Sequence, residues 1–448
     1  MAATHASGRA LDRRRRPGSP SILMPRPERS QRRFGDSASP GAGVARGSAP
    51  ALRRARRRIL LCGALAVLLS CGGGGGGGGG GGSGGPYLVG AHYYVWYPSN
   101  FSQGYLRAAL RPAEAPALGE YDSRDPAVAG EHIALASSHG IDFFALDWWP
   151  NRPSQNDAID AGFLRASNLG QIRFCIFYNS FGLGDRPSEG ILFDAATRSR
   201  FVSDLVGIAR RYFDHPSYLR VDGRPVIELY ITREMRGLFP QAMQEMRQAL
   251  SAEGYDPFVI GDEIFWGVIE ANDDPGAAAR VTGEPQLSRI RLFDAITAYN
   301  LYEGARQQDR GFGSASAFVG DSAALYRRYR DAGGVPIVPV VIPGFNDRGT
   351  RLAADHFVIP RRWAADAAEG SFFSESIERI ARPLVDAHLR MVLITSWNEW
   401  NEDTAIEPVA PAPPTSEDRS GQQLFTQGYT YEGFGTTYLD TVSERLGG

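Results

Sequence analysis

An alternation of short apolar runs with helix-like segments is the feature of this sequence that most constrains its fold. From residue 87 onward, strand-length runs rich in β-branched and aromatic residues are separated by segments of helical length. Eight such units in succession predict an α/β fold with a single (β/α)8 barrel and elaborated loops. The strand-like runs are residues 88–96, 142–148, 172–179, 225–231, 258–264, 295–301, 336–342 and 391–397. The helix-like segments include residues 128–139, 157–168, 198–213, 240–253, 314–332, 373–387 and 438–445, whereas residues 265–293 lack a clean helical period.

Aromatic and polar side chains gather where these runs end. In a (β/α)8 barrel the chemistry lies at the carboxyl ends of the strands, so we predict that these side chains bind substrate. The predicted substrate-binding residues of the first six runs are His92, Tyr93, Tyr94, Trp96, Asp147, Trp148, Tyr178, Glu228, Tyr230 and Tyr299. The alternative is that they fill the barrel core, because the inward or outward direction of each side chain depends on the strand register. For His92 a core hydrogen bond, and for Asp147 a buried pairing inside the barrel, remain open.

The eighth run leads directly into a cluster of Trp, Asn and Glu residues, MVLITSWNEWNEDTAIEP at residues 391–408. Residues three apart in an extended chain face opposite sides. Glu399 and Glu402 therefore meet one substrate only if the strand ends near Glu399 and the backbone turns at Trp400 and Asn401. Two carboxyl groups at the same end of the barrel suit glycosidic cleavage, in which one group is protonated and the other is ionised.

The tryptophans of this cluster favour the same interpretation. Trp397 and Trp400 offer apolar faces on which sugar rings can stack. The alternative is that both glutamates pair with nearby arginines at a strand end. The long loops at residues 344–370 and 409–427 are expected to wall the strand ends into a cleft.

The amino-terminal region has a different composition. Residues 1–52 are basic and poor in apolar residues, so we expect them to be disordered, or untranslated if synthesis starts after Met1. Residues 53–71 combine a basic segment, a short apolar run and Cys71, which resembles a bacterial lipoprotein signal. The apolar run is too short for a comfortable transmembrane helix. We therefore expect a lipid on Cys71 and a flexible glycine-rich linker at 72–86, followed by the catalytic barrel at 87–448.

With these motifs in place, the chain resembles glycoside hydrolase family 99, the endo-α-mannosidase family, and its wider relatives in bacterial glycan loci. The resemblance spans roughly residues 89–446. Its motifs are AHYYVWY at the first run, EYDSRDPAVAGEHIALASSHGIDFFALDWWP through the second, GRPVIELY at the fourth, PIVPVVIPGFNDRGTR at the seventh, ITSWNEWNEDTAIEP at the eighth, and TYLDTVSERL in the last helix. The eighth-run motif is the specific one.

The resemblance implies an α-mannoside-type substrate, cleaved with retention of configuration. Glu399 would act as base on the substrate 2-hydroxyl, and Glu402 as acid and then base. Asn398 would hydrogen-bond near the reacting sugar, and Tyr299 would lie beside it. No metal or other cofactor is needed for this chemistry.

The sequence departs from the family pattern within the eighth-run motif. The family usually has Glu-Trp-His-Glu-Gly there, whereas this chain has Glu-Trp-Asn-Glu-Asp. Asn401 lacks imidazole chemistry, and an ionised Asp403 close to Glu402 is expected to raise the pKa of Glu402. This departure places the mannoside specificity in question.

The sequence thus predicts a lipid-anchored, extracytoplasmic glycoside hydrolase acting on glycan or polysaccharide chains. We expect a monomer held to a membrane through Cys71, with no nucleic-acid partner. Two alternatives remain. One is a polysaccharide-biosynthesis enzyme with transferase character, and the other is a glycan-binding surface lipoprotein without turnover.

Overall fold

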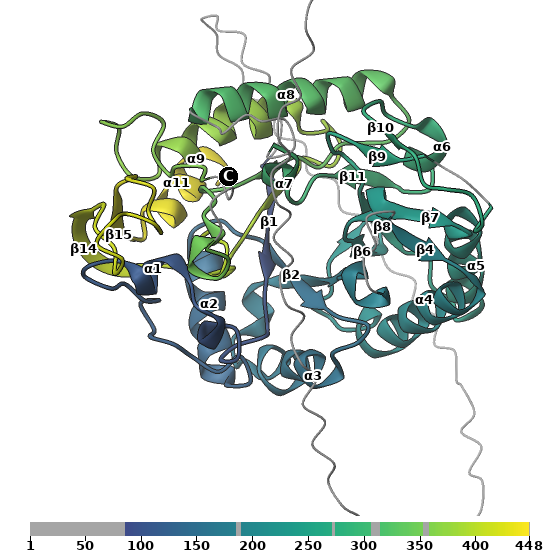
Figure 1. Cartoon of the computed structure of the whole chain (residues 1–448). Helices are drawn as coiled ribbons and strands as arrows, with labels where there is room; N and C mark the ends of the chain where they lie inside the picture. Colours follow the sequence, from purple (N-terminus) through teal and green to yellow (C-terminus); the bar gives the residue numbers. More distant parts are fainter. Residues whose placement is uncertain (1–85, 185–189, 271–273, 306–313, 353–357, 448) are drawn as a thin grey trace, which may run out of the picture. The chain divides into compact units, whose positions relative to one another are not determined.

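Eight parallel strands, drawn with their surrounding helices in Figure 1, form the centre of the molecule. The structure is a computed structural model that describes residues 86–184, 190–270, 274–305, 314–352 and 358–447. Hydrogen bonds link the strands in the order β11, β8, β6, β3, β2, β1, β13, β12. Their bounds are β1 Leu88–Tyr93, β2 Phe143–Trp148, β3 Arg173–Tyr178, β6 Arg224–Leu229, β8 Phe258–Asp262, β11 Ala295–Thr297, β12 Val340–Val341 and β13 Met391–Ile394.

The seventh predicted run closes the ring of strands. Ile296 of β11 pairs in parallel with Ile337, and the Val338 N–H donates to the Ile296 carbonyl at 2.9 Å. Within the same run, β12 pairs with β13. These contacts close the sheet into a (β/α)8 barrel, as the sequence predicts.

Helices follow the strands around the outside of the barrel (Figure 1). Capping residues fix where several begin: the Asp125 carboxylate accepts from the Ala127 N–H at 2.9 Å, and Pro126 opens α2. Asp194 and Ser314 cap α4 and α8 in the same way. The helices are α1 Leu106–Ala109, α2 Pro126–Ser138, α3 Pro153–Ala161, α4 Ala195–Ile208, α5 Phe239–Ala252, α6 Leu287–Ile290, α7 Leu301–Ala305, α8 Ala315–Ala332, α9 Ser371–Ser376, α10 Arg382–Leu384 and α11 Thr437–Arg445.

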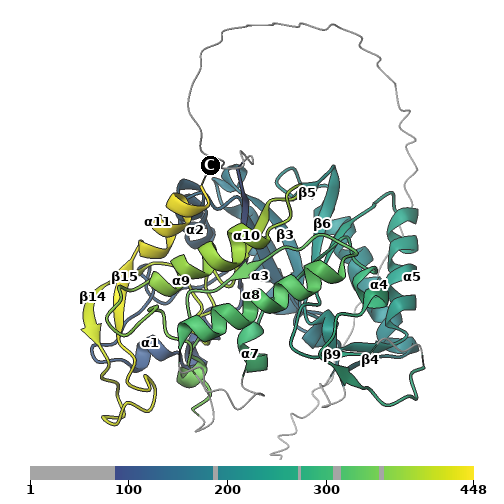
Figure 2. The same cartoon turned by 90° about the horizontal axis from the view of Figure 1, so that it is seen from above.

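Additional short strands form in segments for which the sequence predicts no strand. The Pro-rich residues 409–427 begin with β14, which pairs antiparallel with β15, and Figure 2 shows this hairpin beside α1. The aperiodic residues 265–293 contain a two-stranded ribbon and the short α6. The additional strands are β4 Ile191–Phe193 with β7 Met235–Gly237, β5 Arg220–Val221 beside β6, β9 Val268–Ile269 with β10 Val281–Thr282, and β14 Val409–Thr415 with β15 Tyr431–Gly435.

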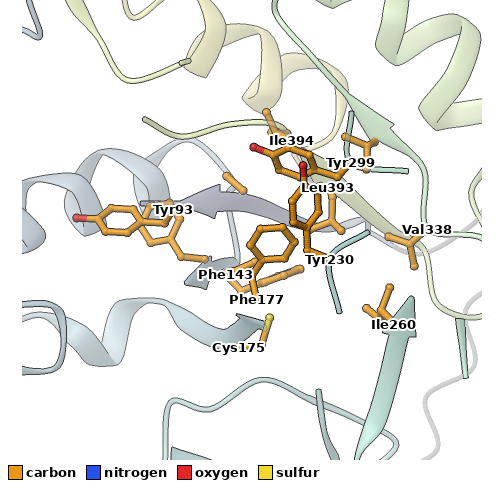
Figure 3. Packing of buried hydrophobic residues seen from close by; sticks show 14 of the residues in the cluster. Tyr93, Phe143, Cys175, Phe177, Tyr230, Ile260, Tyr299, Val338, Leu393 and Ile394 are labelled. Carbon is orange, nitrogen blue, oxygen red and sulfur yellow. The ribbon is translucent and has the colours of Figure 1, made fainter. Parts of the chain in front are cut away.

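Alternate side chains of each barrel strand fill its interior. Figure 3 shows Phe143, Phe177 and Tyr299 gathered inside the barrel, whereas the Tyr93 ring points away from them. Gly90 makes room for this packing, because a Cβ atom there would lie 2.2 Å from the Phe143 ring. The inward set places polar side chains at the carboxyl ends of the strands.

All described residues belong to one compact unit, 79–448. The predicted leader, signal segment and Cys71 lie outside the described residues, as does all of the glycine linker except Pro86. Within the described ranges, no helix combines the length and apolar character needed to cross a bilayer.

Candidate active site

The chain leaves β13 in a tight loop that brings the two glutamates to one side. Ser396 closes the loop by donating its N–H to the Thr404 carbonyl at 2.8 Å, and its hydroxyl accepts from the Glu399 N–H at 2.7 Å. Trp400 and Asp403 form further turn hydrogen bonds within the loop. As a result, the carboxylates of Glu399 and Glu402 line the same cavity.

The Glu399 side chain is almost completely buried, with 3% of its surface exposed. Its Oε1 atom accepts from the Asn401 N–H at 3.0 Å, and no arginine of the described chain pairs with it. Burial raises the pKa of Glu399 well above its usual range, and the charge of Glu402 raises it further. Glu399 therefore holds its proton more readily than an exposed glutamate does.

The Glu402 side chain is more exposed, at 17%, and has stronger partners. Its Oε1 atom accepts from Arg351 Nη2 at 2.7 Å, and its Oε2 atom accepts from the Tyr302 hydroxyl at 2.7 Å. Burial raises the pKa of Glu402, while Arg351 and Tyr302 oppose that rise. These contacts favour the ionised form, so the two carboxyl groups have different environments.

Asp403 does not have the expected effect on Glu402. Its carboxylate turns away into a buried ion-pair cluster, where it accepts from Arg107 Nε at 2.9 Å and Arg361 Nε at 3.0 Å. The acid that raises the pKa of Glu402 is instead Glu303, which lines the same cavity. Sequence adjacency is misleading here, because successive side chains of this loop point to different sides.

The cavity at the carboxyl ends of the strands has a volume of about 270 Å³. Aromatic rings, amides and both signs of charge share its wall, as in sites that bind polar ligands with apolar faces. It is lined by Tyr94, Trp96, Asn100, Gln103, Trp149, Arg152, Asn179, Phe181, Tyr230, Tyr299, Glu303, Thr350, Arg351, Glu399, Asn401 and Glu402. Of the predicted site residues, Tyr94, Trp96, Tyr230, Tyr299, Glu399 and Glu402 lie in this wall.

The aromatic residues of this wall are held in place by one another. The hydroxyls of Tyr94 and Tyr299 share a hydrogen bond, and the Tyr94 ring stacks on Trp96 with centroids 4.2 Å apart. Tyr230 contacts Tyr299 edge to face at 4.9 Å. Rings fixed in this way present a preformed surface to a sugar.

Asp147 lies behind the wall and positions the residues that form it. Its carboxylate accepts from Trp149 Nε1 at 2.5 Å, Asn179 Nδ2 at 2.9 Å and Gln155 Nε2 at 3.1 Å. Burial raises the pKa of Asp147 to about 7, although the bonds from Asn179 and Trp149 oppose this rise. Asp147 is thus paired inside the barrel, the alternative left open by its sequence.

His92 and Glu228 form a buried pair inside the barrel. His92 Nε2 lies 3.1 Å from Glu228 Oε1, and His92 Nδ1 lies 3.0 Å from the Thr395 hydroxyl. The His92 ring also contacts Tyr299 at 4.8 Å. Neither His92 nor Glu228 lines the cavity, so the contact of His92 with Tyr299 supports the wall and does not touch a ligand.

Tyr93 and Trp397, both predicted to bind substrate, face outward instead. The Tyr93 hydroxyl lies 3.0 Å from His132 Nδ1 on α2, and the Trp397 ring contacts both His132 and Phe144. The neighbour of Tyr93 on β1 points inward, so a strand residue one position away takes the opposite face.

Trp148 and Tyr178 also lie outside the barrel. Their rings stack with centroids 5.5 Å apart, and the Tyr178 hydroxyl donates to Asp204 on α4 at 3.0 Å. Of their neighbours in the chain, Asn179 lines the cavity and Asp147 holds it from behind. The stacked pair therefore packs β2 and β3 against the helices.

Asn398 and Trp400 fasten the β13 loop and do not reach the cavity. The Asn398 amide accepts from the Tyr94 N–H at 2.8 Å and donates to the Tyr94 carbonyl at 3.0 Å. Trp400 Nε1 donates to Glu407 at 2.9 Å. Asn398 therefore bonds the backbone of Tyr94, just after β1, in place of the substrate contact that the resemblance implies. The backbone that it holds leads to Trp96 in the cavity wall.

Several wall residues carried little signal in the sequence. Arg351 lies within the seventh-run motif, yet nothing in its spacing indicates that it reaches Glu402. Glu303 of the wall and its neighbour Tyr302, which donates to Glu402, lie on α7 after β11, and the rule for barrel strand ends points to this region. Arg152 and Phe181 come from loops after β2 and β3, and only the fold brings them to the cavity.

The fold and this site define a (β/α)8-barrel protein with two unequal carboxyl groups at the carboxyl end of its sheet. The chain belongs to the family described as Glycosyltransferase WbsX, whose model matches residues 102–412. Within the described residues, no group of three or more His, Cys, Asp or Glu side chains is placed to hold a metal ion.

Two bacterial proteins named Uncharacterized protein WxcX are similar to this chain. The protein from Xanthomonas campestris pv. campestris strain B100 is 25% identical over 311 residues, and that from strain ATCC 33913 is 26% identical over 313 residues. Each match covers 65% of this chain and 40% of the relative. The chain therefore spans less than half the length of these relatives.

Solved structures confirm the resemblance to family 99 at the level of the fold. A GH99 endo-alpha-mannosidase from Bacteroides thetaiotaomicron superposes with a TM-score of 0.52 at 18% identity, covering 80% of this chain and 96% of that one. A glycoside hydrolase-like protein superposes with a TM-score of 0.53 at 21% identity, covering 81% and 94%. At these identities the likeness establishes a shared architecture.

Proposed function

We propose that the protein is an enzyme that hydrolyses glycosidic bonds in glycan or polysaccharide chains, with Glu399 and Glu402 as the catalytic pair. The observation that supports it most is the unequal environment of two carboxyl groups on one cavity wall. Burial and mutual repulsion let the pair hold a single proton, and Arg351 stabilises the negative charge that remains. A protonated and an ionised carboxyl group at one bond are the requirement for glycosidic cleavage.

The family resemblance supplies the finer mechanism in this proposal. Glu399 takes the proton of the substrate 2-hydroxyl, which attacks the anomeric carbon, while Glu402 donates a proton to the leaving oxygen; the net outcome is retention. In the free protein both Glu402 oxygens accept hydrogen bonds, from Arg351 and Tyr302. The environments of the free protein favour the proton on Glu399, so these roles require the single proton of the pair to pass to Glu402 once substrate replaces one of these contacts. Proton NMR of the first product tests retention, and an inverted anomer contradicts it.

An α-mannoside is the substrate class we propose first, because it follows from the resemblance to endo-α-mannosidases. The test is incubation of the full chain with α-mannans, α-glucans and other polysaccharides, with released oligosaccharides separated by chromatography. We expect release from an α-mannoside. Release from another polysaccharide alone would keep the hydrolase and replace its substrate.

Transfer to a second sugar is the other candidate reaction, and the family description favours it. The same carboxylate pair can activate a sugar hydroxyl in place of water. A transferase yields longer chains in place of shorter ones. A glycan-binding protein without turnover yields neither, and its affinity for glycans does not depend on the two carboxylates.

Replacing Arg351 with glutamine is expected to move both limbs of the pH profile of kcat/KM to higher pH. Arg351 lowers the pKa of both Glu399 and Glu402. The singly protonated pair is the active form in this proposal, so removing the positive charge raises both apparent pKa values. Arg351→Lys keeps the charge and is the matched control. An acid limb that stays in place in Arg351→Gln would contradict the coupling.

The lipid anchor and an extracytoplasmic location form part of the same proposal and rest on residues 53–71. We expect wild-type protein in the membrane fraction of cells and Cys71→Ser protein in the soluble fraction. Cys62→Ser is the control, since this thiol lies within the predicted signal. Equal membrane association of wild type and Cys71→Ser would overturn the anchor.

A further inference from the structure

A second cavity, with a volume of about 510 Å³, adjoins the candidate active site. The two cavities share Trp96, Asn100, Gln103 and Arg152 as wall residues. A chain of sugars whose scissile bond lies at the carboxylate pair therefore has room to extend past Trp96. The new cavity lies between the loops that follow β1 and β2.

The charge of this second cavity differs from that of the rest of the barrel. Arg124 and Arg152 line it, and no Asp or Glu of the described chain does. Residues after position 58 carry a net charge of about −14, the whole-chain value of −2 less about +12 for the leader. A cationic cavity in an acidic protein is a local feature, and it attracts an anion where the remaining surface repels one.

Arg152 is placed at the junction of the two cavities by its contacts. Its guanidinium carbon lies 3.9 Å from the centroid of the Trp149 ring, and Nη1 lies 3.5 Å from Gln155 Oε1. Trp149 is itself fixed by its hydrogen bond to Asp147. Stacking on Trp149 thus holds the Arg152 guanidinium in one plane, and its other N–H groups remain available to bind a ligand.

Arg124 is also without a carboxylate partner among the described residues. Its Nη1 atom donates to the Ser154 carbonyl at 3.2 Å, which leaves its other donors for a ligand. The buried arginines of the barrel differ in this respect, since Arg107, Arg233 and Arg361 each pair with an aspartate. Two unpaired guanidiniums on one wall form an anion-recognition surface.

We propose that this second cavity is a subsite for an anionic sugar residue of the glycan. The anion is the carboxylate of a uronic acid or a phosphate ester, which the planar Arg152 fork binds through paired hydrogen bonds. Ser99 and Asn151 on the same wall provide neutral partners for sugar hydroxyls. The position of the scissile bond in this inference rests on the proposed hydrolase function, whereas the anion specificity rests on the arginines alone.

The test is affinity electrophoresis of the full chain in gels that contain alginate, phosphomannan or neutral mannan. A Glu402→Gln background suppresses turnover during the measurement. We expect tighter binding to an anionic polysaccharide than to neutral mannan, and Arg152→Gln is expected to weaken the anionic binding about tenfold at low salt. Arg152→Lys, which keeps the charge but loses the fork, should show a smaller loss. Arg330→Gln is the control, because Arg330 pairs with Asp331 on the surface and lines neither cavity.

Each outcome decides the inference. Preferential binding to alginate, to phosphomannan or to both supports the subsite and identifies the anion. Equal binding of neutral and anionic chains, or an equal loss on both in Arg152→Gln, overturns it. Hydrolysis of neutral mannan by the wild-type chain, together with equal binding of neutral and anionic chains, upholds the hydrolase and overturns the subsite. Arg152-dependent anion binding, with no product in turnover assays of the wild-type chain, upholds the subsite and overturns the hydrolase.

Discussion

Glu399→Gln and Glu402→Gln are each expected to lower kcat/KM for glycan cleavage by roughly 10²–10⁴-fold. Glutamine has the size of glutamate but neither gains nor releases a proton at the reacting bond. The Glu399→Gln side chain can still accept from the Asn401 N–H, and the Glu402→Gln side chain from the Tyr302 hydroxyl. The loss should therefore appear in kcat, with the Kd for glycan changed little, as initial rates and equilibrium binding will show.

Glu303→Gln is the matched control for this pair. It removes a carboxylate from the same cavity wall, and the catalytic pair keeps both of its members. We expect it to retain most of the turnover. Turnover left intact in either pair variant would remove that residue from the proposed mechanism, and an equal loss in all three variants would indicate a general effect of cavity charge.

Asp403→Asn is expected to produce the largest loss of stability, about 3–5 kcal/mol in the free energy of unfolding. Asp403 is the carboxylate that bridges Arg107 and Arg361, and all three side chains are buried. Without the negative charge of Asp403, the positive charges of Arg107 and Arg361 repel each other and are only partly neutralised. Asparagine is the suitable replacement because Asp403 has a φ of +49°, a conformation that asparagine adopts readily.

Denaturant unfolding of wild type and Asp403→Asn measures this effect. Asp331→Asn is the matched control, since Asp331 pairs with Arg330 at an exposed position and should cost less than about 1 kcal/mol. A difference between Asp403→Asn and wild type no larger than that of the control would contradict the structural role. The role matters for function because Asp403 holds the loop that carries Glu402.

The barrel could be predicted from sequence because eight mainly apolar runs of strand length alternate with helix-like segments. The exact strands could not be predicted where prolines interrupt the ladder. Pro339 lacks an N–H, and the seventh run appears as an isolated bridge at Ile337 followed by the two-residue β12. The hairpin of β14 and β15 was missed for a related reason: its prolines lie in an edge pair, where the missing donors are tolerated.

The candidate site was predictable only in part because the faces of the strands depend on register. The sequence places His92, Tyr93 and Tyr94 together at one strand end, but alternation sends Tyr93 to α2 and only Tyr94 to the cavity wall. Arg351 reaches Glu402 from a loop far along the chain. Neither periodicity nor spacing encodes that contact, since it follows from how the loops fold over the finished barrel.

Glycan turnover in oxygen-18 water, followed by mass spectrometry of the products, tests the central claim most directly. If Glu399 and Glu402 carry out hydrolysis, each new reducing end gains one heavy oxygen atom, and the label disappears with the products in both glutamine variants. Elongated products without label would contradict the claim in favour of sugar transfer. Glycan binding with no product at all would contradict catalysis itself.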